Sequence, residues 1–186
     1  MNVKTMLAER AKKYKENEAI VCGRQRLSYQ ELEEGSNRLA NGLIKLGVSK
    51  GDRVLLVLSN CPELVISYLG IAKAGGIAFA VDTRFKAEEL AFMFQDCQPR
   101  ALIGEGPLLK PLDPVLKQTK SIEHIIDLSQ GPVGTFISYR ELLAESPPES
   151  PEVELGSEDS AFFRCTSGTT GRPKQTMISH GAVVAT

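Results

Sequence analysis

The sequence predicts an α/β fold: an open, mostly parallel sheet with helices on both faces, followed by a strand, a glycine-rich loop and the start of another helix. Segments with apolar residues at helical spacing alternate along the chain with short apolar runs. The run RVLLVL at 53–58 is too short for a helix of its own and is typical of a strand covered on both faces. This alternation favours a parallel sheet connected by helices.

The N-terminal segment is predicted to form a helix followed by a hairpin. Apolar residues recur at helical spacing over 3–14. Two short strand-like runs at 19–22 and 26–28 flank a turn that contains Gly23. The inner face of the predicted helix consists of Val3, Met6, Leu7 and Tyr14.

A second helix is predicted to start after the hairpin. Ser28 and Glu31 have the spacing of a capping box, in which a hydroxyl and a carboxylate satisfy free backbone amides at a helix start. Gly47 ends this helix. Its apolar stripe consists of Leu32, Leu39, Leu43 and Leu46.

The rest of the first 144 residues continues the alternation. The helix that starts near Asn60 and Pro62 ends at the glycine pair 75–76. Ser138 and Glu141 repeat the capping-box spacing. The remaining predicted elements are strands at 53–58, 77–81, 101–103 and 124–128 and helices at 86–96 and 139–144.

Residues 145–159, ESPPESPEVELGSED, predict an exposed connection without regular structure, because their prolines remove amide donors. The sequence is therefore predicted to have three parts. These are an α/β subdomain at 1–144, the connection at 145–159, and a strand with a glycine-rich loop at 160–186, where the chain stops within an element.

Composition narrows the class of protein. The formal net charge is −1, and acidic and basic residues are interleaved along the chain. Nucleic-acid binders carry a clustered basic face, so we expect no nucleic-acid partner. We find no apolar run long enough to span a bilayer and no secretory signal, so we expect a cytoplasmic protein. The four cysteines lie far apart without CxxC or zinc-ligand spacing, which predicts free thiols and no metal site.

The string TSGTTGRPK, from Thr166 to Lys174, has the chemistry of a phosphate-binding loop. Four hydroxyl side chains are donors for phosphate oxygens. Gly168 and Gly171 let the backbone turn its amides toward the ligand, and Arg172 and Lys174 add positive charge. A helix start near Ser179 would point further amides at an anion if it faced the loop. His180 is either a cap of that helix or a group near the phosphate site, and we expect the cap.

Two other nucleotide-binding patterns are absent from the sequence. The Walker pattern needs GxxxxGK followed by Ser or Thr, and the dinucleotide fingerprint needs GxGxxG after the first strand. A cluster of Ser, Thr and Gly is often only a solvated loop. Here a strand-like segment precedes the whole nine-residue string and a helix start follows it, which favours phosphate binding.

The loop resembles the signature of the adenylate-forming superfamily, which contains acyl- and aryl-CoA synthetases, luciferases and the adenylation domains of peptide synthetases. LSYQEL at 27–32 and GIAKAGGIAFAVDTRF at 70–85, followed by EEL at 88–90, resemble two further segments of that superfamily in the right order. The resemblance covers nearly the whole chain and implies a flavodoxin-like subdomain of the adenylate-forming fold. The segments at 27–32 and 70–85 are interpreted as structural.

The resemblance implies the N-terminal portion of an ATP-dependent acyl-CoA ligase. Such an enzyme joins a fatty or aryl carboxylate to ATP, releases pyrophosphate and passes the acyl group to CoA. The residues implied to hold the β- and γ-phosphates are Thr166, Ser167, Gly168, Thr169, Thr170, Gly171 and Lys174. The Mg²⁺ ligand and every catalytic residue are expected outside this segment, and we therefore expect the segment alone to be inactive.

The sequence departs from the family pattern at both edges of the loop. Cys165 stands where the family usually has Tyr or Phe, and Gln175 stands where a glycine usually follows the lysine. Two alternatives to the ligase stay open. One is an adenylation domain that loads a carrier protein, and the other is a non-catalytic α/β binding module with a degenerate loop.

Overall fold

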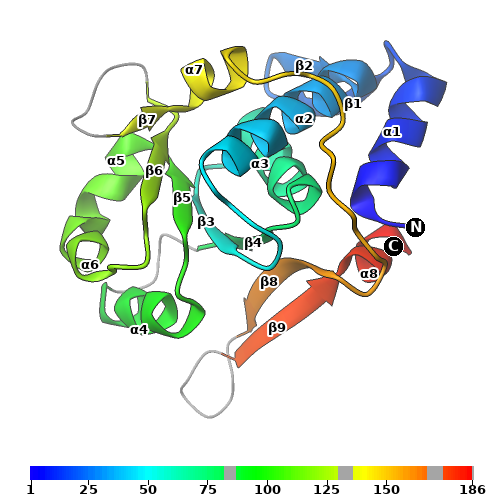
Figure 1. Cartoon of the computed structure of the whole chain (residues 1–186). Helices are drawn as coiled ribbons and strands as arrows, with labels where there is room; N and C mark the ends of the chain where they lie inside the picture. Colours follow the sequence, from blue (N-terminus) through cyan, green and yellow to red (C-terminus); the bar gives the residue numbers. More distant parts are fainter. Residues whose placement is uncertain (82–86, 130–135, 167–173, 186) are drawn as a thin grey trace.

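The computed structural model describes residues 1–81, 87–129, 136–166 and 174–185 (Figure 1). In these ranges seven strands form one sheet in the order β7-β6-β5-β3-β4-β8-β9. All neighbouring strands run parallel except β8 and β9, which are antiparallel. The strands are β3 (Arg53–Val57), β4 (Ile77–Ala80), β5 (Ala101–Gly104), β6 (His124–Asp127), β7 (Ile137–Ser138), β8 (Ser160–Thr166) and β9 (Lys174–Ser179). The predicted open, mostly parallel sheet is confirmed.

The N-terminal elements confirm the sequence patterns. The Ser28 hydroxyl accepts a hydrogen bond from Glu31 N, and the Glu31 carboxylate accepts one from Ser28 N at 2.7 Å. These bonds to Ser28 lower the pKa of Glu31. The second helix ends just before Gly47, whose φ of 86° suits a residue without a Cβ. The elements are α1 (Val3–Tyr14), the separate hairpin β1 (Glu18–Cys22) and β2 (Gln25–Ser28), and α2 (Tyr29–Lys45).

Helices cover both faces of the sheet, because the strands between them bury alternate side chains on opposite sides. Val54 and Leu56 of β3 pack in the core that α2, α3 and α7 cover. Leu55 and Val57 of the same strand pack in the core that α4, α5 and α6 cover. The covering helices are α3 (Pro62–Lys73), α4 (Ala87–Cys97), α5 (Gly106–Leu109), a 3₁₀ turn (Lys110–Leu112), α6 (Asp113–Gln118) and α7 (Tyr139–Ala144).

The structure adds elements that the sequence patterns missed. The helical turns between 106 and 118 contain three prolines and have no counterpart among the predicted elements. Each of these prolines lies in the first turn of its helix, where a missing amide costs nothing. The short strand β7 was also missed. The second capping box is half formed. The Ser138 hydroxyl accepts from Glu141 N, but among the described contacts Ser138 N does not donate to the Glu141 carboxylate.

Residues 145–159, named the strap below, cross α2 without forming a helix or strand (Figure 1). Side chains of the first two helices donate hydrogen bonds to its carbonyl oxygens. Asn37 donates to Pro148 O at 2.8 Å and Lys4 donates to Val153 O at 2.6 Å. Ser146 and Pro151 are buried. The predicted absence of regular structure is confirmed, although the strap is bound to the helices by these contacts. The division into parts at 1–144, 145–159 and 160–186 stays a prediction.

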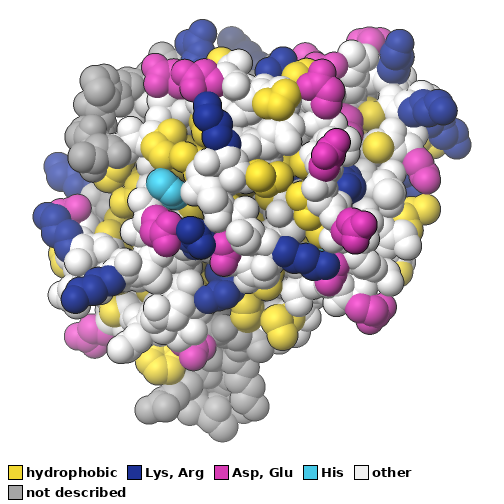
Figure 2. All heavy atoms as spheres, viewed as in Figure 1, with side chains coloured by type: hydrophobic (Ala, Val, Ile, Leu, Met, Phe, Trp, Pro, Cys, Tyr) yellow, Lys and Arg dark blue, Asp and Glu magenta, His cyan; other side chains and the backbone are white. Residues whose placement is uncertain are grey.

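Charged side chains of both signs alternate over the face shown in Figure 2, and neither sign forms a continuous patch there. Within the described residues, no helix is both long enough and apolar enough to cross a bilayer.

Candidate functional site: the β8–β9 hairpin

The hairpin of β8 and β9 carries the predicted phosphate loop at its tip. β8 lies beside β4, with Ala78 opposite Phe162 and Phe79 opposite Phe163. It then continues beyond the end of β4, while β9 pairs with it along its whole length. The tip therefore extends past the carboxyl ends of the parallel strands, the edge where open α/β sheets bind their ligands.

Aromatic contacts fix the base of this hairpin against the sheet. The ring of Phe162 lies edge-on to Tyr68 of α3, with centroids 5.1 Å apart. Phe163 packs on Phe79 on the opposite face, with centroids 5.8 Å apart. Burial raises the pKa of Tyr68, and the nearby Arg164 partly opposes this rise. The strand that leads into the loop is thus held on both faces.

The structure brings the two ends of the predicted binding segment together. Thr166 and Lys174 are opposite each other in the last described pair of the ladder. Such opposed residues have Cα atoms about 4.5–5.5 Å apart. The residues between them, 167–173, lie outside the described part of the chain. They include the predicted Ser167, Gly168, Thr169, Thr170 and Gly171.

The helix start near Ser179 does not face the loop, so the condition for its contribution is not met. β9 intervenes, so α8 (His180–Val184) begins at the base of the hairpin, at the end opposite the tip. The predicted cap is wrong, because the Ser179 hydroxyl caps α8 by accepting from Ala182 N. His180 instead is fully buried, and its Nδ1 accepts a hydrogen bond from Val3 N.

Two carboxylates at the carboxyl edge were missed by the sequence analysis. Glu105, after β5, accepts from the backbone N and the hydroxyl of Ser59, after β3, at 2.9 and 2.5 Å. Asp127, at the end of β6, accepts from Gly106 N and Ser129 N. The signal for both was a polar residue at the end of each apolar run. These carboxylates repel anions, which makes the ends of β5 and β6 unfavourable for a phosphate group.

The bridge between Glu105 and Ser59 also lies where the helices change sides of the sheet. β3 is followed by α3 on one face, and β5 is followed by α5 and α6 on the other. Such a switch point usually opens a ligand crevice. Here the Glu105 carboxylate joins the two strand ends, which leaves the β8–β9 hairpin as the better candidate at this edge.

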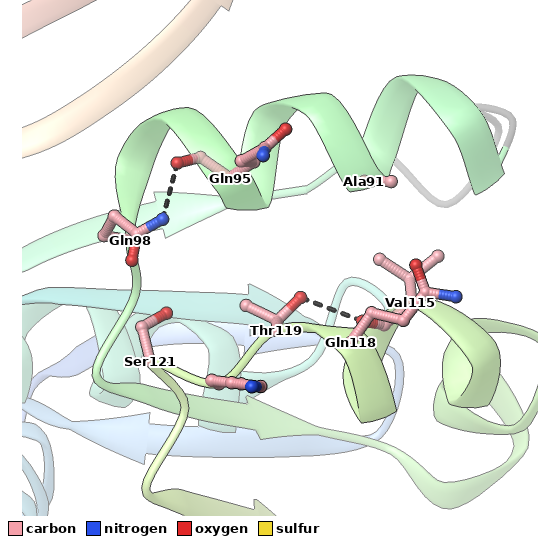
Figure 3. Close-up of a pocket in the computed structure, with 8 residues that line it drawn as sticks. Ala91, Gln95, Gln98, Val115, Gln118, Thr119 and Ser121 are labelled. Atoms are coloured by element: carbon pink, nitrogen blue, oxygen red, sulfur yellow. Dashed lines mark hydrogen bonds between the residues drawn. The ribbon is translucent and has the colours of Figure 1, made fainter.

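A polar hollow lies at the opposite edge of the sheet (Figure 3). It has a volume of about 290 Å³ and lies between α4 and α6, near the start of β6. In it the Gln98 amide donates to Gln95 O, and the Thr119 hydroxyl donates to Val115 O. It lies at the amino ends of the strands, away from the predicted phosphate loop.

Two of the described cysteines, Cys22 and Cys61, are free thiols, as predicted. Cys22 and Cys61 are half-buried and Cys97 is buried. Burial raises the pKa of Cys61 to about 11, which disfavours the reactive thiolate. In the described ranges, no group of three or more His, Cys, Asp or Glu side chains is arranged to hold a metal ion.

Lys73 gives the segment at 70–85 a structural role, in agreement with its interpretation. Its side chain is fully buried, and Nζ lies 2.6 Å from Glu33 Oε2 and 2.7 Å from Asn37 Oδ1. Burial lowers the pKa of Lys73, and the Glu33 carboxylate opposes this effect. These contacts of Lys73 hold α3 against α2. Its last part, residues 82–85, lies outside the described part of the chain.

Comparison with known proteins gives consistent matches. The AMP-binding enzyme family matches residues 7–186. The chain is 37% identical over 170 residues to a medium/long-chain-fatty-acid–CoA/3-oxocholest-4-en-26-oate–CoA ligase of Mycobacterium marinum, covering 87% of the chain and 31% of that protein. It is 32% identical over 184 residues to a plipastatin synthase of Bacillus subtilis, covering 99% of the chain and 6% of that protein.

Among solved structures, the anthranilate CoA ligase AuaEII in complex with anthranoyl-AMP matches with a TM-score of 0.91 and 26% identity. That match covers 97% of this chain and 35% of the other. The chain thus spans about a third or less of the length of these relatives. From the family match over nearly its whole length, together with the shared fold, the chain belongs to the AMP-binding enzymes of the adenylate-forming superfamily.

Proposed function

We propose that this chain is the N-terminal portion of an ATP-dependent acyl-CoA ligase and that its β8–β9 hairpin holds the β- and γ-phosphates of ATP. The observation that carries the proposal is the string TSGTTGRPK at the tip of a hairpin that extends past the carboxyl edge of the sheet. The proposed phosphate-binding residues are Thr166, Ser167, Gly168, Thr169, Thr170, Gly171 and Lys174.

The physical task of the loop is to neutralise phosphate charge. A carboxylate and a triphosphate are both anions, so the carboxylate can approach the α-phosphorus only when the phosphate charge is balanced. Hydroxyls, turned backbone amides and Lys174 would supply that balance. We propose Mg²⁺ as a further source of positive charge and CoA as the acceptor of the acyl group, in a cytoplasmic enzyme. The fatty or aryl acid is proposed from the activities for which the relatives are named.

Lys174→Ala is expected to weaken ATP binding by about tenfold to a hundredfold, the value of one charge-assisted hydrogen bond. Lys120→Ala is the matched control, because Lys120 lines the polar hollow at the far edge of the sheet. Titration of each variant with ATP and Mg²⁺, followed by the chemical shifts of hairpin amides, measures the difference. Equal affinity of both variants would remove Lys174 from the site.

The 186-residue chain alone is expected to bind ATP more weakly than micromolar and to have no ligase activity. Each charge-assisted hydrogen bond contributes roughly 1.5–3 kcal/mol. Ordering the loop costs about 1–2 kcal/mol per residue over roughly nine residues, so bonds summed over all the proposed phosphate-binding residues would nearly cancel this cost. The same ATP titration tests affinity, and ATP–pyrophosphate exchange tests activity. Micromolar binding or measurable exchange by the chain alone would contradict this prediction.

An adenylation domain that loads a carrier protein is the second candidate. The match to the plipastatin synthase, over 99% of the chain, favours keeping it. The coding sequence downstream of Thr186 separates the candidates. A YGxTE-like segment and a C-terminal lysine motif support the ligase, and an adjacent carrier-protein segment supports the second candidate. A stop codon directly after Thr186 would contradict both.

A further inference from the structure

The base of the β8–β9 hairpin is closed by backbone hydrogen bonds at the end opposite the loop. Asp159 precedes β8 and His180 follows β9, and His180 N donates to Asp159 O at 2.9 Å. Gly181 N donates to Ser157 O at 2.7 Å. The two ends of the hairpin therefore start from one fixed point. The tip lies about 20 Å away along the strands, given about 3.3 Å per residue.

An ion pair ties this fixed point to the rest of the molecule. Lys50 Nζ lies 2.6 Å from Asp159 Oδ2, and the same oxygen accepts from Gly156 N at 2.7 Å. These two bonds lower the pKa of Asp159. Lys50 also donates to Glu154 O of the strap. Because Lys50 lies in the turn before β3, this pair links the hairpin base to the central strand of the sheet.

The imidazole of His180 forms a second contact, which connects the base of the hairpin to α1. Its side chain is 0% exposed, and its Nδ1 accepts a hydrogen bond of 3.4 Å from the backbone N of Val3. Val3 is the first residue of α1. Nδ1 must then be unprotonated, so the neutral ring carries its proton on Nε2. Nε2 has no hydrogen-bond partner among the described residues. An apolar side chain would avoid this buried polar atom, which indicates that the imidazole has a purpose beyond filling space.

We propose that Lys50, Asp159 and His180 form a base clamp that positions the phosphate loop, with neutral His180 as its pH-sensitive member. The proposal rests on the proposed function, because it concerns the geometry in which the loop meets ATP. None of the three residues lies in the loop. They act as positioning residues, by fixing the angle at which the hairpin leaves the sheet.

Protonation of His180 at Nδ1 would break one of the contacts that form the base clamp, the hydrogen bond from Val3 N. A proton on Nδ1 would face the N–H of Val3, so the hydrogen bond between them would be lost. The N-terminus of α1 also disfavours a positive charge there. The charged groups that act on the ring are Asp159 of the strap, which favours the cation, and Lys50, which disfavours it. Burial outweighs Asp159 and lowers the pKa of His180 below its ordinary value of 6.5.

The lowered pKa of His180 determines how the stability of the fold depends on pH. The unfolded chain takes up a proton on His180 near pH 6.5, whereas the folded chain takes it up only at lower pH. The contribution of the neutral ring to stability is therefore complete above pH 6.5 and declines as the pH falls toward the folded pKa. The clamp itself is expected to loosen only when the pH reaches the folded pKa, because the folded ring stays neutral above it.

Two substitutions at position 180 separate positioning from packing. Asn is expected to keep an acceptor near the place of Nδ1 but cannot be protonated, whereas Leu fills space without an acceptor. At pH 7.5, His180→Asn is expected to bind ATP within about twofold of the wild type. His180→Leu is expected to bind about two- to tenfold more weakly, the effect of one lost hydrogen bond. As the pH falls through the lowered pKa of His180, the wild type is expected to lose more affinity than His180→Asn. The protonation of ATP itself affects both proteins equally.

The experiment uses the ¹⁵N-labelled chain, with ATP and Mg²⁺ as the probe, and also records the His180 tautomer and the hydrogen exchange of β8 and β9 amides without ATP. We expect the proton on Nε2 and faster exchange in His180→Leu. Identical pH profiles for wild type and His180→Asn would overturn the inference, as would exchange in His180→Leu that matches the wild type. If the wild type shows no ATP binding, which agrees with the weak affinity expected of the chain alone, the tautomer and the exchange of the hairpin amides still test the clamp. If His180→Leu does not fold, Lys50→Met tests it by the same exchange measurement.

Discussion

Lys73→Met is expected to lower the free energy of unfolding by about 3–5 kcal/mol, as measured by urea denaturation. The Lys73 side chain is 0% exposed, and its Nζ lies 2.6 Å from a Glu33 carboxylate whose side chain is only 13% exposed. Methionine fills similar space but leaves that carboxylate without its cation in a site poor in water. The cost of such an unpaired buried charge exceeds the value of the pair itself.

An exposed ion pair of the same length is the matched control. Lys117 Nζ lies 2.6 Å from Asp113 Oδ2, and the two side chains are 75% and 54% exposed. Lys117→Met is expected to cost no more than about 0.5 kcal/mol, because water solvates the remaining carboxylate. Adding Glu33→Gln to Lys73→Met is expected to recover much of the loss, since the glutamine side chain carries no charge. Equal effects of the two lysine substitutions would show that burial does not determine the cost.

Gly70→Ala is expected to destabilise the fold by roughly 1–3 kcal/mol, although alanine favours helices by about 1 kcal/mol over glycine. Gly70 lies in α3 where it crosses α2. A Cβ at this position would come within 2.9 Å of both Cβ and Cδ2 of Leu39, which is fully buried. The Leu39 Cβ is fixed to the backbone of α2, so the two helices must separate. Thermal or urea denaturation measures the loss.

Gly35 of α2 provides the control at the same helix pair. A Cβ there would meet the far end of the Ile66 side chain at 3.4 Å, an ordinary contact. Gly35→Ala is therefore expected to leave stability unchanged or raise it by up to about 1 kcal/mol. If Gly70→Ala were as stable as Gly35→Ala, the close approach of α2 and α3 at Leu39 would not limit the side chain at position 70.

Local signals in the sequence predicted the elements whose causes are local. The residues of the Ser28–Glu31 capping box lie three positions apart, so their reciprocal bonds need no distant partner. The bounds of α1 and α7 were predicted for the same reason. β9 was missed because KQTMIS becomes a strand only through its pairing with β8. The contacts that hold the strap were missed because their donors, such as Asn37, lie more than 100 positions away.

Some features of the candidate site were likewise predicted from local sequence, and others appeared only in the folded chain. The sequence determined the family resemblance and the residues proposed to bind phosphate. Hydroxyls, glycines and a lysine lie within nine consecutive positions, so the phosphate-binding pattern is visible in the local sequence. Only the folded chain showed that Thr166 and Lys174 meet across a ladder and that the following helix starts away from the loop. Folding also brought His180 to Val3, a contact between residues 177 positions apart. Pairing between distant segments depends on the packing of the whole chain, and no local pattern records it.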